Sequence, residues 1–190
     1  MRVVLATGNA AKVAELRPLL APREVEGAPE GFDVEETGVT LFQNAWLKAR
    51  ALRARLGDDS VVLADDTGLV VHALGGRPGV FSARYAGPDA TYADNCRRLL
   101  EELEGVEDRG AAFVCVLVGL RADGSMLVAS GSCPGRIAPA MRGSGGFGYD
   151  PVFLPEGEAR SMAEMSREEK AAISHRGRAA RRMAALLDLS

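Results

Sequence analysis

The stretch Val61-Val62-Leu63-Ala64-Asp65-Asp66-Thr67-Gly68-Leu69 joins an apolar run directly to two neighbouring carboxylates. The four apolar residues predict a buried β-strand. Carboxylates that follow a buried strand are costly unless they meet a cation or water. Ligands of open α/β sheets bind beyond the carboxyl ends of the strands, so the stretch predicts an α/β protein with a site at this strand end. The alternative is a structural, Asp-rich turn in which Asp66 caps local backbone.

The two aspartates are expected to have different partners. Neighbouring side chains on an extended segment point in opposite directions. One of Asp65 and Asp66 would therefore face a metal ion and water, while the other holds the loop or a second cation. Paired carboxylates suit Mg²⁺, which keeps several of its waters and bridges phosphates.

A second candidate site lies near the N-terminus, where the run Val3-Val4-Leu5-Ala6 predicts another buried strand. The turn Thr7-Gly8-Asn9-Ala10-Ala11-Lys12 leads into a helix expected to span residues 10–20. Gly8 permits a tight turn, and the N–H groups at the start of the helix favour an anion. Lys12 can reach back to a phosphate, although the loop lacks the Gly-Lys-Ser/Thr ending of a Walker loop. The alternative is a plain strand-to-helix turn with a solvated lysine.

Two longer helices are predicted further along the chain. The first covers residues 40–56, with Gly57 as its stop signal, and the second covers residues 89–103, with Asp89 as its cap. Apolar residues recur at steps of three and four in both helices and predict their inner faces. These residues are Phe42, Ala45, Ala49, Leu52 and Leu56 in the first helix and Tyr92, Cys96, Leu99, Leu100 and Leu103 in the second.

The remaining segments complete the predicted fold. The segment 22–38 is rich in Pro, Gly and Glu and should be mostly loop. Strands over residues 111–120 and 126–130 flank an Asp-Gly pair, which signals a hairpin. Helices alternate with strands early and a hairpin follows, so we expect an α/β fold with a mixed central sheet and flanking helices. No linker is visible, so residues 1–190 should form a single domain with two lobes around a substrate cleft.

Lysine is scarce in this chain: the 23 basic residues comprise twenty arginines and only Lys12, Lys48 and Lys170. A compact ammonium on a flexible stem suits a point-charge contact to phosphate. Lys48 lies four residues after Asn44, so the two share one helix face, and the pair Glu35-Glu36 precedes that helix. The alternative is coding bias for the lysines and a solvated helix face for this segment.

The loop Gly143-Ser144-Gly145-Gly146-Phe147-Gly148-Tyr149-Asp150-Pro151 combines four glycines with two aromatic rings. Its glycines allow close approach to a ligand, and a ring can stack on a base. A purely structural glycine-rich turn would rarely also present Phe147 and Tyr149. We therefore favour a role in ligand binding.

The segment from Ser166 to Arg178 carries the third lysine. Ser166 and Glu169 form a capping-box pattern, and Ser174 can cap a new helix. A helix break near Ser174 would allow Lys170, His175 and Arg176 to converge on an anion or a carbonyl oxygen. The other histidine, His72, lies in an apolar run and is expected to be structural.

Composition narrows the possible partners. The net charge of −3 argues against a nucleic-acid polymer as the main partner, but a local cationic pocket can still bind a nucleotide. Cys96, Cys115 and Cys133 are far apart, without metal-like spacing, and predict thiols in a reducing cytoplasm. No apolar run approaches the length of a membrane span, so we expect no membrane association.

Five stretches together resemble the inosine triphosphate pyrophosphatases, the Ham1-like family of dITP/XTP pyrophosphatases that act on noncanonical purine nucleotides. They are ATGNAAK, EETGVTLFQNAWLKA, LADDTGLVVHALGGRPGVFSARYAG, GFGYDPVF and EEKAAISHRGRA, in this order over nearly the whole chain. The resemblance implies hydrolysis of dITP, ITP and XTP to the monophosphate and pyrophosphate with Mg²⁺. It also implies a two-lobed α/β fold with the site in the cleft, usually as a homodimer.

The resemblance also implies roles for individual residues. Asp66 would be the proton acceptor and a metal ligand, together with a glutamate that is either Glu35 or Glu36; Asp65 is a further candidate ligand. Thr67 would touch substrate, where many members of the family have serine. The remaining substrate contacts implied by the matching motifs, with Lys48 added from its helix face, are Thr7, Gly8, Asn9, Ala10, Ala11, Lys12, Lys48, Phe147, Gly148, Tyr149, Asp150, Lys170, His175 and Arg176.

Two other functions remain open at this point. A phosphotransferase could use the first loop as a phosphate cradle, and a nucleotide-sensing module could bind without catalysis. The acidic pairs argue against a sensor, because a protein that only binds an anion gains little from four carboxylates unless a metal is bound. Analysis of the reaction products separates all three.

Overall fold

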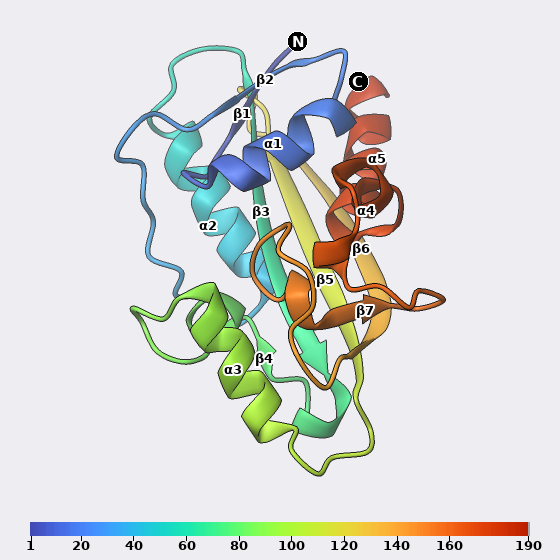
Figure 1. Cartoon of the computed structure of the whole chain (residues 1–190). Helices are drawn as coiled ribbons and strands as arrows, with labels where there is room; N and C mark the ends of the chain where they lie inside the picture. Colours follow the sequence, from blue (N-terminus) through green and yellow to red (C-terminus); the bar gives the residue numbers. More distant parts are fainter. Residues whose placement is uncertain (190) are drawn as a thin grey trace. The chain divides into compact units, whose positions relative to one another are not determined.

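The computed structural model describes residues 1–189 and contains seven strands and five α-helices in that range (Figure 1). The strands are β1 Arg2–Leu5, β2 Glu24–Gly27, β3 Val61–Val71, β4 Pro78–Gly79, β5 Gly110–Leu120, β6 Met126–Ile137 and β7 Phe153–Pro155. The α-helices are α1 Ala10–Leu19, α2 Leu41–Arg53, α3 Tyr92–Glu102, α4 Arg167–Ile173 and α5 His175–Asp188. Short 3₁₀ helices occur at His72–Leu74, Ser82–Arg84, Asp150–Val152 and Met162–Glu164.

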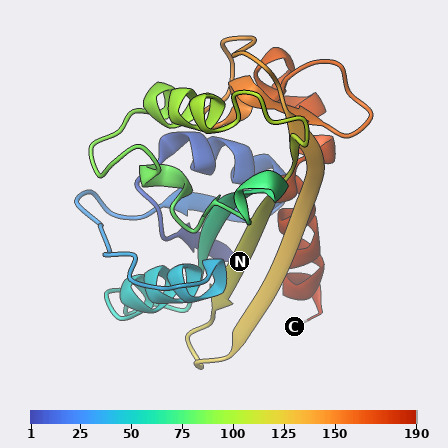
Figure 2. The same cartoon turned by 90° about the horizontal axis from the view of Figure 1, so that it is seen from below.

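All seven strands belong to one mixed sheet, which confirms the predicted fold class. The order is β2-β1-β3-β5-β6-β7, and β4 pairs with β3 off this path. Strand β1 pairs in parallel with β2 and β3, whereas β3 with β4 and β6 with β7 pair antiparallel. The long neighbours β5 and β6 can be followed in Figure 2. They are joined by the predicted turn, in which Gly124 has a positive φ of 84°.

The chain divides into two compact units. The first contains Met1–Asp66, Cys115–Gly131 and the C-terminal stretch that begins at His175; the second contains Thr67–Val114 and Ser132–Ser174. Strands β3, β5 and β6 each run from one unit into the other.

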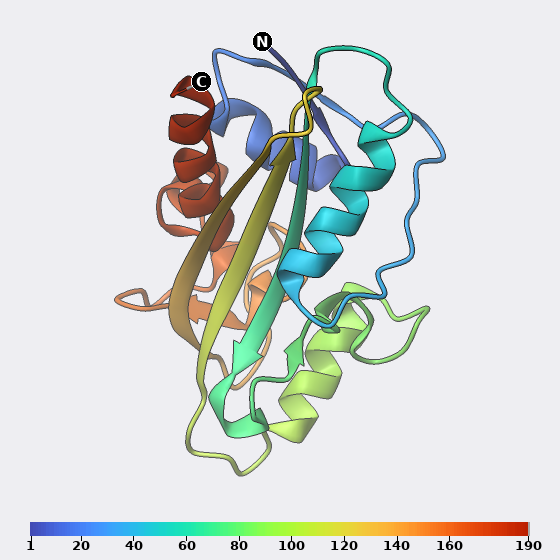
Figure 3. The same ribbon diagram turned by 180° about the vertical axis from the view of Figure 1, so that it is seen from behind.

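The first unit has helices on both faces of its sheet (Figures 1 and 3). Val3 and Leu5 of β1 pack in a cluster with residues of α1 and α5, while Val4 and the following residue Ala6 pack in a cluster with α2. This alternation follows from the two-residue period of a strand. Strand β1 is therefore buried on both faces, as its continuous apolar run predicts.

The second unit has its own core, in which α3 packs with parts of β3, β5 and β6. Leu69 and Val71 of β3 lie in one cluster with Leu99 of α3 and Phe153 of β7. The rings of Phe113 and Phe153 are tilted by 57° with their centroids 4.7 Å apart. That geometry is favourable for an aromatic pair.

Several boundaries differ from the predictions. Strand β3 continues to Val71, so the two aspartates lie within it and not beyond its end. Helix α2 stops at Arg53, three residues before the predicted end at Leu56, and the Arg53 guanidinium binds the carbonyls of Leu56, Asp58 and Ser60. The last residue of the helix therefore supplies hydrogen-bond donors to the carbonyl groups of the loop that follows it.

Two predicted inner-face residues and one predicted cap are wrong. Phe42 is 39% and Tyr92 is 47% exposed, because both lie in the first turn of their helices, where the buried stripe has not yet begun. The cap of α3 is Thr91, not Asp89, and its side chain accepts a hydrogen bond from the N–H of Asp94. The break between α4 and α5 at Ser174 is confirmed, and the capping box of Ser166 and Glu169 is present.

Candidate functional site

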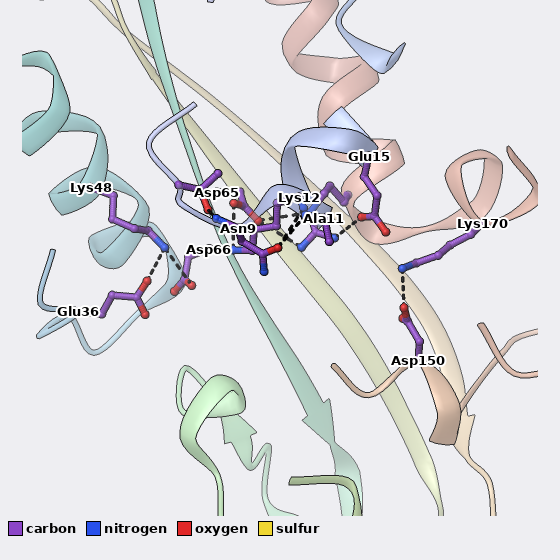
Figure 4. A network of polar contacts seen from close by, with 12 residues as sticks. Asn9, Ala11, Lys12, Glu15, Glu36, Lys48, Asp65, Asp66, Asp150 and Lys170 are labelled. Atoms are coloured by element: carbon purple, nitrogen blue, oxygen red, sulfur yellow. Dashed lines mark hydrogen bonds and ion pairs between the residues drawn. The ribbon is translucent and has the colours of Figure 1, made fainter. Parts of the chain in front are cut away.

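The aspartate pair lies where β3 leaves its pairing with β1. The last paired residues are Leu5 and Leu63, and the N–H of Ala6 donates to the Leu63 carbonyl. Asp65 is 3% and Asp66 is 6% exposed. Because β1 ends before this point, side chains from α1 and α2 (Figure 4) and from α5 lie next to the two carboxylates.

Asp65 is bound by two cations of the first unit. Its Oδ1 lies 3.0 Å from Lys12 Nζ, and its Oδ2 lies 3.3 Å from a terminal nitrogen of Arg176. Burial opposes ionisation, but the positive charges of Lys12, Arg176 and Lys48 outweigh it and lower the pKa of Asp65. Asp65 is therefore the aspartate that holds cationic side chains, and its assignment as a metal ligand stays a prediction.

Asp66 points to a different set of partners. Asn44 Nδ2 donates to its Oδ2 over 3.2 Å, and Lys48 Nζ lies 3.6 Å from its Oδ1. Burial and the nearby carboxylate of Glu36 raise the pKa of Asp66, against the opposing effect of Lys48 and Asn44. A carboxylate with a raised pKa is a stronger base than an ordinary aspartate. Asp66 thus differs from Asp65 in its partners, and its roles as metal ligand and proton acceptor stay predictions.

Glu36, not Glu35, is the glutamate that lies near Asp66. Lys48 Nζ is 2.5 Å from Glu36 Oε1, so this ammonium stands between the carboxylates of Glu36 and Asp66. Burial lowers the pKa of Lys48, but Asp65, Asp66 and Glu36 outweigh it, so that its pKa is raised overall. Glu35 is exposed. Glu36 is therefore the better placed of the two glutamates, and its role as a metal ligand stays a prediction.

The acidic pair fits a divalent cation. Within residues 1–189 no group of three or more His, Cys, Asp or Glu side chains is placed to hold a metal ion by itself. Glu36 and Asp66 supply two carboxylates, and the Lys48 ammonium between them shows that the pair accepts positive charge. Mg²⁺ is commonly held by one or two carboxylates, with water and substrate phosphates completing its shell.

The loop after β1 is shaped by its own side chains. Asn9 caps α1, and its Oδ1 accepts from the N–H groups of Ala11 and Lys12 at 2.9 and 3.4 Å. Thr7 Oγ1 accepts from the N–H of Asn9. Asn9 therefore occupies two of the N–H groups that were expected to face an anion. The Lys12 ammonium, with its side chain 17% exposed, remains the group in this loop best suited to a phosphate.

Arg176 is held more tightly than the sequence suggested. It is 2% exposed, and besides Asp65 it contacts Glu15 Oε2 at 2.6 Å through Nη1. Glu15 lies one turn after Lys12 on α1 and was missed in the sequence, although the three-residue spacing places both on one face. His175 is equally buried at the start of α5.

The second unit carries the other predicted ligand-binding group. Lys170 Nζ lies 2.6 Å from Asp150 Oδ2 and 4.9 Å from the ring centroid of Phe147. The same Asp150 oxygen accepts from the N–H of Phe147, so Asp150 organises the glycine-rich loop. The ring of Tyr92 lies 6.0 Å from that of Phe147. Phe147 is partly exposed, and its role as a stacking ring stays a prediction.

Tyr149 lies in the core of the second unit and, unlike Phe147, is buried. It is 4% exposed, and its hydroxyl donates to the Ser82 carbonyl over 2.9 Å. Burial raises the pKa of this phenol. The predicted convergence of Lys170 with His175 and Arg176 stays a prediction, because Lys170 belongs to the second unit and the other two belong to the first.

The sheet carries a buried aspartate pair within β3, just past the end of β1, with a glutamate and two lysines beside it. This combination defines a class of α/β proteins suited to a metal-bound phosphate ligand. The chain belongs to the Ham1 family, whose model matches residues 3–186. The dITP/XTP pyrophosphatase of Shigella flexneri is 51% identical over 186 residues, which cover 94% of this chain and 93% of that one. The enzyme of the same name from Geobacillus kaustophilus is 52% identical over 185 residues, covering 93% and 89%.

Solved structures agree with this assignment. The Ham1 protein of Staphylococcus aureus superposes with a TM-score of 0.88 at 40% identity and covers 99% of this chain and 98% of that one. Nucleotide pyrophosphatases in general require a divalent metal ion, because their substrates carry several negative charges. None of the helices formed by residues 1–189 combines the length and apolar character of a membrane span.

Proposed function

We propose that this chain hydrolyses purine nucleoside triphosphates with a 6-keto base, namely dITP, ITP and XTP, to the monophosphate and pyrophosphate. The observation that carries the proposal is the cluster of Asp66, Glu36 and Lys48 in a protein about half identical to dITP/XTP pyrophosphatases. Mg²⁺ is the proposed metal, and Glu36 and Asp66 are the residues that would hold it. When bound, it neutralises phosphate charge and lowers the pKa of a coordinated water.

The residues of the first unit can perform the chemical step. A water oxygen attacks the α-phosphorus, and the bond from this phosphorus to the oxygen that bridges to the β-phosphorus breaks. Asp66 accepts the proton of the attacking water, a role supported by the raised pKa of its carboxyl. Lys12 and Lys48 offset negative charge that grows on the departing pyrophosphate. Asp65 keeps the Lys12 ammonium in place through their 3.0 Å contact.

Base selection in this proposal depends on hydrogen-bond polarity. A 6-keto purine presents an acceptor where adenine presents an amino donor. A pocket lined by donors, for which His175 and Arg176 of the first unit are candidates, would leave donor facing donor when adenine enters. Such a mismatch can reject an analogue by about 10⁴-fold. Phe147 is the candidate ring for stacking on the base.

The decisive experiment is pyrophosphate release from ITP, XTP, ATP and GTP, with and without Mg²⁺. We expect release from ITP and XTP that depends on the metal. Asp66→Asn should keep its fold, because asparagine fills the same volume and still accepts from Asn44, but should reduce kcat by at least about 100-fold. Near-normal hydrolysis of ITP by this variant would rule out Asp66 as the proton acceptor.

The same assay separates the rival functions. A phosphotransferase would release diphosphate and a phosphorylated acceptor, and a sensor would bind ITP with Mg²⁺ and release no pyrophosphate. We further propose a cytoplasmic homodimer: the resemblance of the sequence motifs implies the dimer, and three buried cysteines are compatible with a reducing compartment. Sedimentation velocity should give a single species of twice the mass of one chain.

A further inference from the structure

Asn44 connects the two carboxylates that would hold the metal ion. It lies on α2, one turn before Lys48, and is fully buried with 0% exposure. Its Nδ2 donates to Asp66 Oδ2 over 3.2 Å, and its Oδ1 accepts from the N–H of Gly38 over 2.8 Å. Both ends of this one amide are therefore engaged, one with β3 and the other with the loop that carries Glu36.

Gly38 makes the approach of that loop possible. A Cβ at position 38 would lie 2.5 Å from Asn44 Oδ1 and 2.9 Å from the Asn44 nitrogen, closer than such atoms come in proteins. Gly38 follows Glu36 by only two residues, so the hydrogen bond to Asn44 restrains the backbone from which the Glu36 side chain extends.

An amide is also the right chemical group for this position. Asp66 already has the positively charged Lys48 near its Oδ1. A second cation at Oδ2 would compete with a metal ion, whereas an amide N–H orients the carboxylate and leaves its charge intact. Residues that hydrogen-bond to metal ligands commonly contribute about 10- to 100-fold to metal affinity in this way.

We propose that Asn44 is a positioning residue, which fixes the spacing and orientation of Glu36 and Asp66 so that the pair binds a divalent cation. This inference rests on the proposed function, because it assumes that the pair binds the metal. It concerns affinity for the metal in the absence of any nucleotide. It can therefore be tested apart from catalysis.

The test is Mn²⁺ binding to the nucleotide-free protein, followed by electron paramagnetic resonance and calorimetry. Asn44→Leu keeps the branched shape of the side chain and removes both hydrogen bonds, and we expect about 10- to 100-fold weaker binding. Gly38→Ala perturbs the same connection from the loop and leaves the buried helix residue unchanged, so it should weaken binding even if Asn44→Leu folds poorly. In both variants, raising Mg²⁺ should recover part of the lost ITP hydrolysis.

Asn95 provides a matched control. It is 1% exposed, and both ends of its amide are likewise engaged, with the N–H of Ala86 and the carbonyl of Ala83. Asn95→Leu removes a comparable pair of bonds in the second unit and should leave Mn²⁺ affinity unchanged within about twofold. Equal affinity in folded wild type, Asn44→Leu and Gly38→Ala would overturn the inference. If wild type itself neither binds Mn²⁺ nor hydrolyses ITP, the proposed function has failed as well.

Discussion

Lys48 is the residue whose chemical type matters most at the acidic pair. Its ammonium contacts Glu36 at 2.5 Å and Asp66 at 3.6 Å from a side chain that is only 11% exposed. A guanidinium is planar and larger, and it cannot occupy the same point between two carboxylates. We expect Lys48→Arg to lower kcat/KM for ITP by roughly 10- to 100-fold although the charge is kept.

Arg50 supplies the control for this substitution. It lies on the same helix, is exposed, and its guanidinium stacks 5.1 Å from the ring centroid of Trp46. Arg50→Lys should leave ITP hydrolysis within about twofold of wild type, since solvent-exposed positions tolerate either cation. Steady-state kinetics on both variants measure the difference, and an equal effect of the two would contradict a special role for the Lys48 ammonium.

For single residues, the sequence predicted which residue types belong to the candidate site better than it predicted their contacts. The aspartate pair and the lysines were identified from residue type and from their place next to an apolar run. The choice between Glu35 and Glu36 depends on how an irregular loop turns, and no periodicity encodes that. Asn44 was noted only as a neighbour of Lys48, because its two hydrogen-bond partners come from segments 6 and 22 residues away.

Local capping chemistry decides where the helices begin. The α3 segment contains two candidate aspartates, and the structure uses Thr91 with Asp94 in a reciprocal capping box, while Asp89 is exposed. The pattern Thr-x-x-Asp differs from the usual box, which has glutamate or glutamine in the fourth position, so the sequence gives it a weaker signal than an aspartate cap. Strand β3 also continues past its expected end. Buried cationic side chains neutralise the two carboxylates, so the carboxylates do not have to lie in a solvent-exposed turn.

The capping box makes a pH-dependent prediction. Hydrogen bonds from Thr91, joined by Arg97, lower the pKa of Asp94 from 3.8 to about 2. A lowered pKa means that the ionised carboxylate stabilises the folded state; this contribution is complete above pH 3.8 and is lost as the pH falls through about 2. Asp94→Ala should lower Tm by a few degrees at pH 7, and the difference should shrink as the pH approaches 2. Differential scanning calorimetry measures both.

Asp89→Ala is the matching control for the cap. Asp89 was the cap expected from sequence, but it is exposed and lies two residues before Thr91. Its replacement should leave Tm unchanged at every pH. A larger loss of stability from Asp89→Ala than from Asp94→Ala would show that the helix begins where the sequence first suggested.

For the whole molecule, the fold class was predictable from the sequence, but the segments that make up each of the two compact units were not. Alternating strands and helices with a late hairpin predicted a mixed α/β sheet, and that sheet is present. The two compact units consist of segments far apart in the chain, which a pass along the sequence cannot group. Three strands are common to both units, so residues on one strand contribute to two cores. On β3, Leu63 lies in the core of the first unit and Leu69 in that of the second.

Because the cores share strands, we propose that they unfold together as one domain. The reactivity of each cysteine thiol measures the unfolding of the core that buries it. Cys115 is buried in the first core, and Cys96 and Cys133 are buried in the second. Burial, aided by Asp150, raises the pKa of Cys96 to about 11, so at pH 8 the native protein should be alkylated extremely slowly. We expect all three thiols to become reactive at one urea concentration, read for each peptide by mass spectrometry. A midpoint for Cys115 distinct from that of Cys96 and Cys133 would mean that the units unfold separately, since two-state unfolding requires coincident transitions.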